Sequence, residues 1–389
     1  MMKKYPIVNG AASRLRSLCE SAVRLKYNND TLQAAEDYLA WEFEAIERAG
    51  APAVFLYLKD LTEKLGLKKH QYIVSWFYGG SMVTYLLDLS EIDPIQYNLP
   101  PEMEFGIHKD KPVELRLAVS EEYFQEATKY YETVDGVQAV VDLTVEGLDF
   151  PCRRMLLIPE GSEIPIVNTI QDEDSVRHEF YRQGIVSYVI FDVLSKLFEI
   201  TGRTDSDITI YDKNVMGFFK HYDGTDEYYE RVPKVRRMSS YKIQSEFEIE
   251  TYRELARIQS LDVGKGVWWD NQEWLVREGV ADIRNVIAER EDIYDNCLMR
   301  GFDREFAYKV ADDVARGRVL KGTSSIWNEA KPLLLNAGMP EWYVGACEKI
   351  EYLPHRWYPV SYMMLDWKLA WFKVHYPDMF MQVIDGYKF

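Results

Sequence analysis

The chain has 389 residues, of which 47% are hydrophobic and 14% aromatic, so it can bury a large core and is not a disordered protein. Its formal net charge of −17 disfavours strong autonomous binding to a nucleic-acid duplex, which requires a basic footprint. No apolar run reaches the roughly 20 residues of a membrane span, and the first residues lack the apolar core of a signal peptide. The four cysteines lie far apart without a CxxC pair, which disfavours a disulfide framework and favours the reducing cytoplasm, with no membrane partner.

The first hundred residues carry helical patterns. In residues 30–50 the apolar side chains fall along one helical face, with Asp30 as the predicted N-cap and Gly50 as the predicted stop. Residues 51–66 repeat this pattern, and a second apolar stretch ends at the turn signal Asp93-Pro94.

The middle of the chain changes to a strand-like pattern. Residues 113–120, 137–145, 153–159 and 185–195 are short, rich in β-branched and apolar residues, and separated by turn residues. They predict one mixed sheet. In residues 113–120 the apolar side chains alternate with Glu114 and Arg116, which predicts that both of these share the face opposite the core.

From about residue 240 onward the pattern is helical again. Asp270 is a predicted cap and Gly279 a predicted stop, and apolar residues recur at every fourth position in residues 303–317. Residues 360–377 are dense in tyrosine, methionine and tryptophan, which indicates a buried helix rather than a cofactor site.

Several stretches together resemble one known family. The stretches "EDYLAWEFEAIERAGAPAVFLYLKDL" and "YGGSMVTYLLDLSEIDPIQYNL" are followed by "KNVMGFF", "SLDVGKGVWWDNQEWLVREG", "RGFDREFAYKVADDVARG", "MPEWYVGACEKIEYLP" and "LAWFKVHYPDMF". In this order, across residues 36–380, they resemble the palm and fingers of C-family bacterial DNA polymerases, the polymerase III α subunits of the PolC type.

The resemblance implies an α+β fold with a nucleotidyltransferase-like palm, a small mixed sheet and a mainly helical, fingers-like lobe. By this resemblance residues 1–110 form the N-terminal helical part of the palm, and residues 111–200 form the palm sheet with its thumb largely deleted. Residues 201–350 would form the fingers-like lobe, and residues 351–389 its C-terminal helix.

The resemblance also implies where a catalytic site would lie. The family uses three aspartates and two Mg²⁺ ions to transfer nucleotides, and here Glu114, Arg116 and Asp192 take the three aspartate positions. Arginine has no acceptor atom and does not lose its charge, so it cannot bind Mg²⁺. We therefore expect no cofactor and a salt bridge of Arg116 with Glu114 and Asp192; in an active enzyme, Glu114 and Asp192 would hold the metal.

Simpler interpretations of these residues stay open. Glu114 and Arg116 can belong to an ordinary solvated strand face, since a register read from one sequence can slip by one residue. Asp192 can be a capping or turn carboxylate.

Other residues give weaker hints of nucleotide or DNA binding. Gly79, Gly80 and Ser81 stand where the family has a phosphate-cradling loop, but the loop lacks the family's arginine, and a tight turn is the favoured interpretation. Bulky residues, Arg356 to Tyr358, occupy a segment where the family has small ones. The remaining candidates are Arg153 and Arg154, which replace family glycines, and Arg236 and Arg237, which lie among tyrosines and can equally form a solvated loop.

These observations favour a catalytically inactive relative that acts as a binding or interaction factor in DNA replication, such as a replisome decoy of a mobile element or phage. Its expected partners are replication proteins, with weak binding to DNA. A divergent metal-dependent nucleotidyltransferase is the first alternative, and a non-catalytic single-strand-binding factor is the second.

Overall fold

In the computed structural model the chain divides into two compact units, residues 1–205 and 206–389. The structure describes residues 5, 8–75, 78–141, 154–163, 184–232 and 238–387. It confirms an α+β fold in which a small mixed sheet precedes a mainly helical region. The finer division into four segments stays a prediction.

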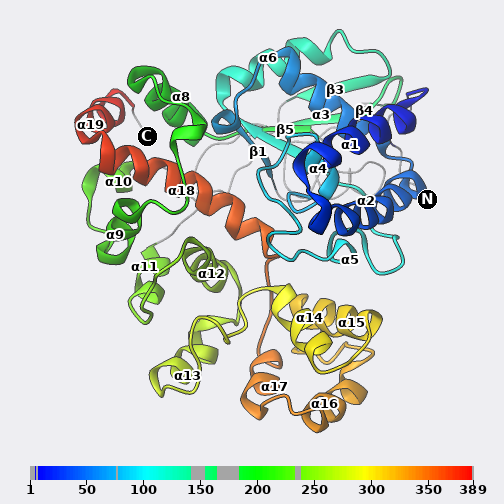
Figure 1. Ribbon diagram of the computed structural model, residues 1–389, viewed down its shortest axis with the longest axis vertical. Helices are drawn as coiled ribbons and strands as arrows, with labels where there is room; N and C mark the ends of the chain where they lie inside the picture. Colours follow the sequence, from blue (N-terminus) through cyan, green and yellow to red (C-terminus); the bar gives the residue numbers. More distant parts are fainter. Residues whose placement is uncertain are drawn as a thin grey trace. The chain divides into compact units, whose positions relative to one another are not determined.

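Unit 1 begins with helices and then builds a sheet (Figure 1). Its helices are α1 (Ala11–Lys26), α2 (Asn29–Ala49), α3 (Pro52–Lys64), α4 (Met82–Leu86), α5 (Pro101–Phe105), α6 (Glu121–Tyr131) and α8 (Ile190–Thr201), with the short turns η1 (Lys69–Gln71) and η2 (Asp205–Asp207). Its strands are β1 (Tyr72–Ser75), β2 (Arg116–Val119), β3 (Val137–Val141), β4 (Arg154–Pro159) and β5 (Gly184–Ser187).

The five strands form one sheet in the order β1-β2-β5-β4-β3. The pair β2–β5 is parallel, and the other three pairs are antiparallel. The first helices pack on one sheet face in a common hydrophobic core, which includes Leu15 of α1, Phe43 of α2 and Leu117 of β2.

The helix boundaries correct two predicted caps. Helix α2 is capped by Asn28, whose side chain accepts the backbone N–H of Asp30, so Asp30 is not the cap. Gly50 ends this helix in the left-handed conformation, as predicted. Asp270 is not a cap either, because it lies in the left-handed region inside the turn η3 and the following helix begins at Glu273.

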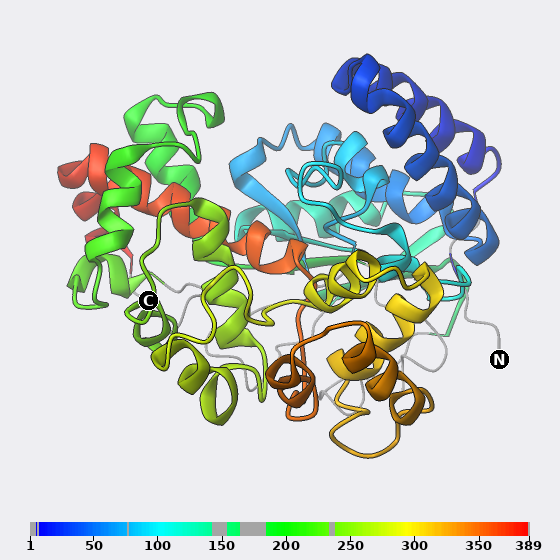
Figure 2. The ribbon, with the colours of Figure 1, turned by 60° about the horizontal axis from the view of Figure 1, so that its bottom comes forward.

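The regular elements of unit 2 are all helical among its described residues. It comprises α9 (Lys213–His221), α10 (Glu227–Arg231), α11 (Met238–Gln244), α12 (Tyr252–Val263), η3 (Trp268–Gln272), α13 (Glu273–Arg277), α14 (Arg290–Met299), α15 (Arg304–Ala315), α16 (Trp327–Asn336), α17 (Glu341–Cys347), α18 (Trp357–His375) and α19 (Pro377–Gly386). Figure 2 shows α14 to α17 grouped together in yellow to orange.

Helix α18 is the central helix of a second group of helices in unit 2. Helices α9, α10, α12 and α19 pack against it, and Trp357, Tyr362 and Trp367 are among its fully buried residues. This confirms the prediction of a buried helix rich in large side chains. No helix in the described ranges is long and apolar enough to cross a membrane.

Candidate functional site

The backbone before β2 holds Glu114 in place through three hydrogen bonds. The Tyr5 hydroxyl donates to the Val113 carbonyl at 3.1 Å and accepts the Val113 N–H at 2.8 Å. The Leu115 carbonyl accepts the Gly184 N–H at 3.1 Å. Glu114 therefore lies in a fixed, extended segment two residues before Arg116, which opens strand β2.

Both faces of this segment are buried. The apolar residues Val113, Leu115 and Leu117 belong to the core, as the alternating pattern predicted. On the other face Glu114 is 9% and Arg116 only 2% exposed. The interpretation as an ordinary solvated strand face is therefore wrong, and two oppositely charged residues are withdrawn from water here.

The residues paired with Arg116 on the neighbouring strands are small and carry no carboxylate. Arg116 lies opposite Ser75 of β1 and Gly184 of β5. Gly184 has a φ of 141°, and a Cβ at this position would lie 1.9 Å from the carbonyl oxygen of Met155. Only glycine fits this close approach, so no acidic side chain can be placed here without moving the sheet.

Asp192 lies in the first turn of helix α8, not on a strand. Strand β5 ends at Ser187, and the apolar residues that follow it continue as a helix because they bury a helical face. The Asp192 carboxylate accepts a hydrogen bond from the backbone of Glu121 at the start of α6, while desolvation raises its pKa to about 6. This geometry agrees with the open interpretation of Asp192 as a capping carboxylate.

The predicted salt bridge of Arg116 with Glu114 and Asp192 is not found. Among the described residues, no hydrogen bond or ion pair joins Arg116 to either carboxylate. The same part of the chain contains no group of three histidine, cysteine, aspartate or glutamate residues arranged to hold a metal ion. A guanidinium, a serine and a glycine are not the donor set of a magnesium site, so these residues do not fit the two-ion centre.

The Gly79-Gly80-Ser81 segment forms a turn that leads into helix α4, and an internal carboxyl group accepts hydrogen bonds from Ser81 and from the start of this helix. The carboxylate of Glu42, fully buried on α2, accepts the Ser81 hydroxyl at 2.7 Å and the N–H groups of Met82 and Val83 at 3.0 Å each. Desolvation raises the pKa of Glu42 to about 8, against the effect of these three bonds. The segment is thus a packed turn closed by an internal carboxylate, which agrees with the favoured interpretation.

Sequence analysis missed Glu42, although one signal was present. Glu42 falls between Leu39, Phe43 and Ile46 on the apolar face of α2, all of which are buried. A charged residue on such a face must find buried partners.

The remaining predicted binding residues are largely outside the described part of the chain. Arg153, Arg236 and Arg237 are not among the described residues, and of Arg154 only the backbone is described, which pairs with Val186. Their roles stay predictions.

Arg356 joins a cluster of charged residues in unit 2 that sequence analysis did not foresee. Its guanidinium contacts Glu289 at 3.0 Å and Asp295 at 2.9 Å, and its backbone N–H donates to Glu291 at 2.8 Å. Arg257 in turn contacts Asp292 at 2.7 Å and holds the pKa of that carboxyl far below its usual range despite burial. We refer to the following seven residues as the α14 charge cluster: Arg253, Arg257, Glu289, Glu291, Asp292, Asp295 and Arg356.

Comparison with known proteins relates the chain to bacterial replication enzymes. Residues 13–146 match the family model described as the bacterial DNA polymerase III alpha NTPase domain. The DNA polymerase III PolC-type of Oceanobacillus iheyensis is 20% identical over 96% of this chain and 33% of its own length. That of Caldanaerobacter subterraneus subsp. tengcongensis is 26% identical over 57% of this chain and 16% of its own length.

The chain is similar to PolC-type DNA polymerase III. A third protein of this type, from Lacticaseibacillus paracasei, is 32% identical over 33% of the chain and 8% of its own length. The chain thus spans at most a third of the length of these proteins. The match over residues 13–146 includes the Gly79-Gly80-Ser81 turn, Glu114 and Arg116.

Proposed function

We propose that this PolC-type relative does not catalyse nucleotide transfer and acts as a binding or interaction factor in DNA replication. The observation that carries the proposal is the burial of Arg116 opposite Ser75 and Gly184, at the position to which the resemblance assigns the second metal ligand. A permanent cation in a place that requires acceptor oxygens cannot bind a divalent ion and repels it.

The placement of Asp192 supports the same proposal. Its carboxylate is engaged with the start of α6. Even if Arg116 moved, the structure offers no second strand carboxylate beside Glu114 among the described residues of β1 and β5. The alternative of a divergent nucleotidyltransferase therefore requires ligands from outside the described residues.

Primer extension with Mg²⁺ or Mn²⁺ tests the proposal. We expect no template-dependent incorporation by the full chain, while a PolC-type polymerase assayed in parallel extends the primer. Incorporation that disappears in Asp192→Asn or Glu114→Gln would show that the chain is an enzyme.

Calorimetric titration with Mn²⁺ gives a second readout that does not depend on turnover. We expect no site tighter than about 1 mM, a range in which weak oxygen-ligand sites bind divalent ions. Binding in this range that is lost in Glu114→Gln would favour the nucleotidyltransferase instead.

A further inference from the structure

A cavity of about 690 Å³ lies in unit 2. Its walls come from the end of α9, from α11 and from the segment between α11 and α12, residues 245–250. Of the predicted binding residues that the structure describes, none lines it.

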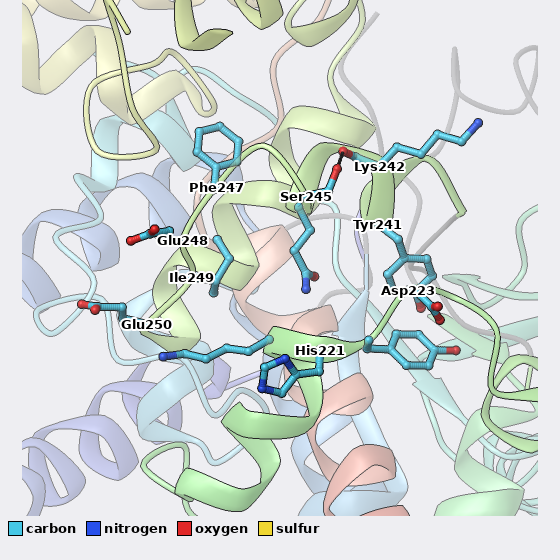
Figure 3. Close-up of a pocket in the computed structure, with 12 residues that line it drawn as sticks. His221, Asp223, Tyr241, Lys242, Ser245, Phe247, Glu248, Ile249 and Glu250 are labelled. Carbon is cyan, nitrogen blue, oxygen red and sulfur yellow. Dashed lines mark hydrogen bonds between the residues drawn. The ribbon is translucent and has the colours of Figure 1, made fainter.

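Three carboxylates, two lysines and a histidine are among the residues that line this cavity. Figure 3 shows Glu248 and Glu250 on one side and Asp223 on the other, and the Lys242 side chain points away from the cavity. Among the described residues none of these three carboxylates has an ion-pair partner, and Asp223 accepts hydrogen bonds only from Thr225. The rim is therefore available to an external cation.

The two basic residues that remain at the rim have a local reason to be there. Lys220 and His221 form the last turn of α9, where the carbonyl ends of a helix favour positive charge. Among the described lining residues the three carboxylates still outnumber the lysines, on a chain whose net charge is already −17.

Aromatic rings line the interior of the cavity and are fixed in place. The rings of Tyr222 and Tyr241 lie edge to face with centroids 4.9 Å apart, and both hydroxyls donate to Glu230. Phe247 packs against Trp268 with centroids 5.3 Å apart. Aromatic faces beside carboxylates are a favourable environment for a guanidinium or ammonium group.

We propose that this cavity binds an arginine or lysine side chain from a basic segment of a partner protein. The carboxylates at the rim pair with the cationic head, and the aliphatic stem packs against Ile249 and the aromatic rings. The same carboxylates repel the phosphates of a nucleic acid. The inference names a partner class for the proposed interaction role and rests on that role.

Fluorescence anisotropy of the full chain with a short labelled peptide of alternating arginine and glycine tests the inference. We expect binding that weakens about tenfold or more in the double variant Glu248→Gln/Glu250→Gln, because two charge-assisted contacts are lost. The matched control, Glu36→Gln/Glu199→Gln, removes the same two charges from exposed positions of unit 1 and should bind as the unchanged chain does.

A second variant fills the cavity without changing its charge. Ser245 is exposed and lines the cavity, so Ser245→Trp should abolish peptide binding while the thermal melting curve stays the same. Equal peptide binding by the cavity variants and the control would overturn the inference, as would equally tight binding of a labelled glutamate-glycine peptide to the full chain. Primer extension does not depend on this peptide. A negative peptide-binding result therefore refutes the cavity inference alone, whereas primer extension by the chain refutes the proposed lack of catalysis.

Discussion

At the scale of single residues, Glu42 and Arg116 show that ionisable side chains are built into the interior of unit 1. Glu42 holds the turn before α4 by three hydrogen bonds and is fully buried. Arg116 is the first residue of β2, and the apolar residues that alternate with it point to the other face of the sheet, into the core. A charged residue in an apolar pattern therefore marks an internal structural role at both positions.

The raised pKa of Glu42 predicts a pH-dependent stability. Its folded-state pKa of about 8 lies above the ordinary value of 4.5, so the folded chain retains a proton that the unfolded chain releases. This contribution is present at acidic pH and is lost as the pH rises from about 5 through 8. In Glu42→Gln this pH dependence should disappear, and the loss of one acceptor should cost about 1–3 kcal/mol.

Urea unfolding between pH 5 and 8.5 measures this effect. The difference in unfolding free energy between the unchanged chain and Glu42→Gln should shrink as the pH rises. Glu47→Gln, which removes an exposed partner of Arg16, is the control and should show no such trend. If the difference in unfolding free energy between the unchanged chain and Glu42→Gln grows with pH, the pKa of Glu42 is not raised in the folded chain.

At the scale of elements, the central strand β5 depends on Gly184. Its φ of 141° and the approach of the Met155 carbonyl leave no room for a Cβ. We expect Gly184→Ala to lower the unfolding free energy by about 3 kcal/mol or more, since the backbone of β4 or β5 must shift. Denaturant unfolding followed by circular dichroism measures the loss.

Gly217 in α9 is the matched control for this substitution. An added Cβ meets no atom within 4 Å, and the residue has helical geometry. Gly217→Ala should change the unfolding free energy by less than about 1 kcal/mol or raise it, because alanine favours the helix. Equal losses in the two variants would refute the steric argument.

The α14 charge cluster predicts a large cost when one member is removed. Glu289 is fully buried, and its carboxylate accepts hydrogen bonds from Arg253, Arg356 and Ser260. Glu289→Gln should lower stability by about 3–5 kcal/mol, because buried guanidinium groups lose their counter-charge.

Chemical unfolding of Glu289→Gln beside Glu199→Gln checks this prediction. Glu199 forms an exposed pair with Lys196, so its substitution should cost less than about 1 kcal/mol. A cost of similar size at both positions would mean that the cluster contributes no more than surface pairs do.

The elements that could be predicted from sequence are those with long, clear periodicity. Helices such as α3, α15 and α18 follow from their apolar spacing and lie where we expected them. The error at Asp192 arose because a continuous apolar run fits both a buried strand and a buried helix. The spacing of Ile190, Leu194 and Leu197, followed by the left-handed Gly202, was the helical signal.

The candidate site was only partly predictable, because periodicity within one segment does not give the contacts of that segment with others. Alternation placed Glu114 and Arg116 on one face, and the structure agrees. Which residues of other strands lie beside them depends on register, and Ser75 belongs to a four-residue strand that sequence analysis missed. Contacts between distant segments, such as Glu42 with Ser81, leave no periodic signal.

At the scale of the whole molecule, the net charge of −17 sets what the chain can bind. A polyanion must overcome this repulsion unless a local basic surface offsets it. We expect a labelled single-stranded oligonucleotide to bind with a dissociation constant weaker than about 10 µM at physiological salt.

Anisotropy titration over a range of salt concentrations measures this binding. Tight binding with a steep salt slope would instead support the single-strand-binding alternative, and loss of that binding in Arg236→Gln/Arg237→Gln would locate it.

The strand order also determines when the sheet can form as the chain is made. Strand β5 lies between β2 and β4, yet it is the last of the five to be synthesised. Until residue 187 has left the ribosome, the pair β1–β2 and the hairpin β3–β4 each carry an open edge. The nascent chain is therefore most prone to aggregation just before β5 emerges, and this is the stage at which a chaperone would be needed.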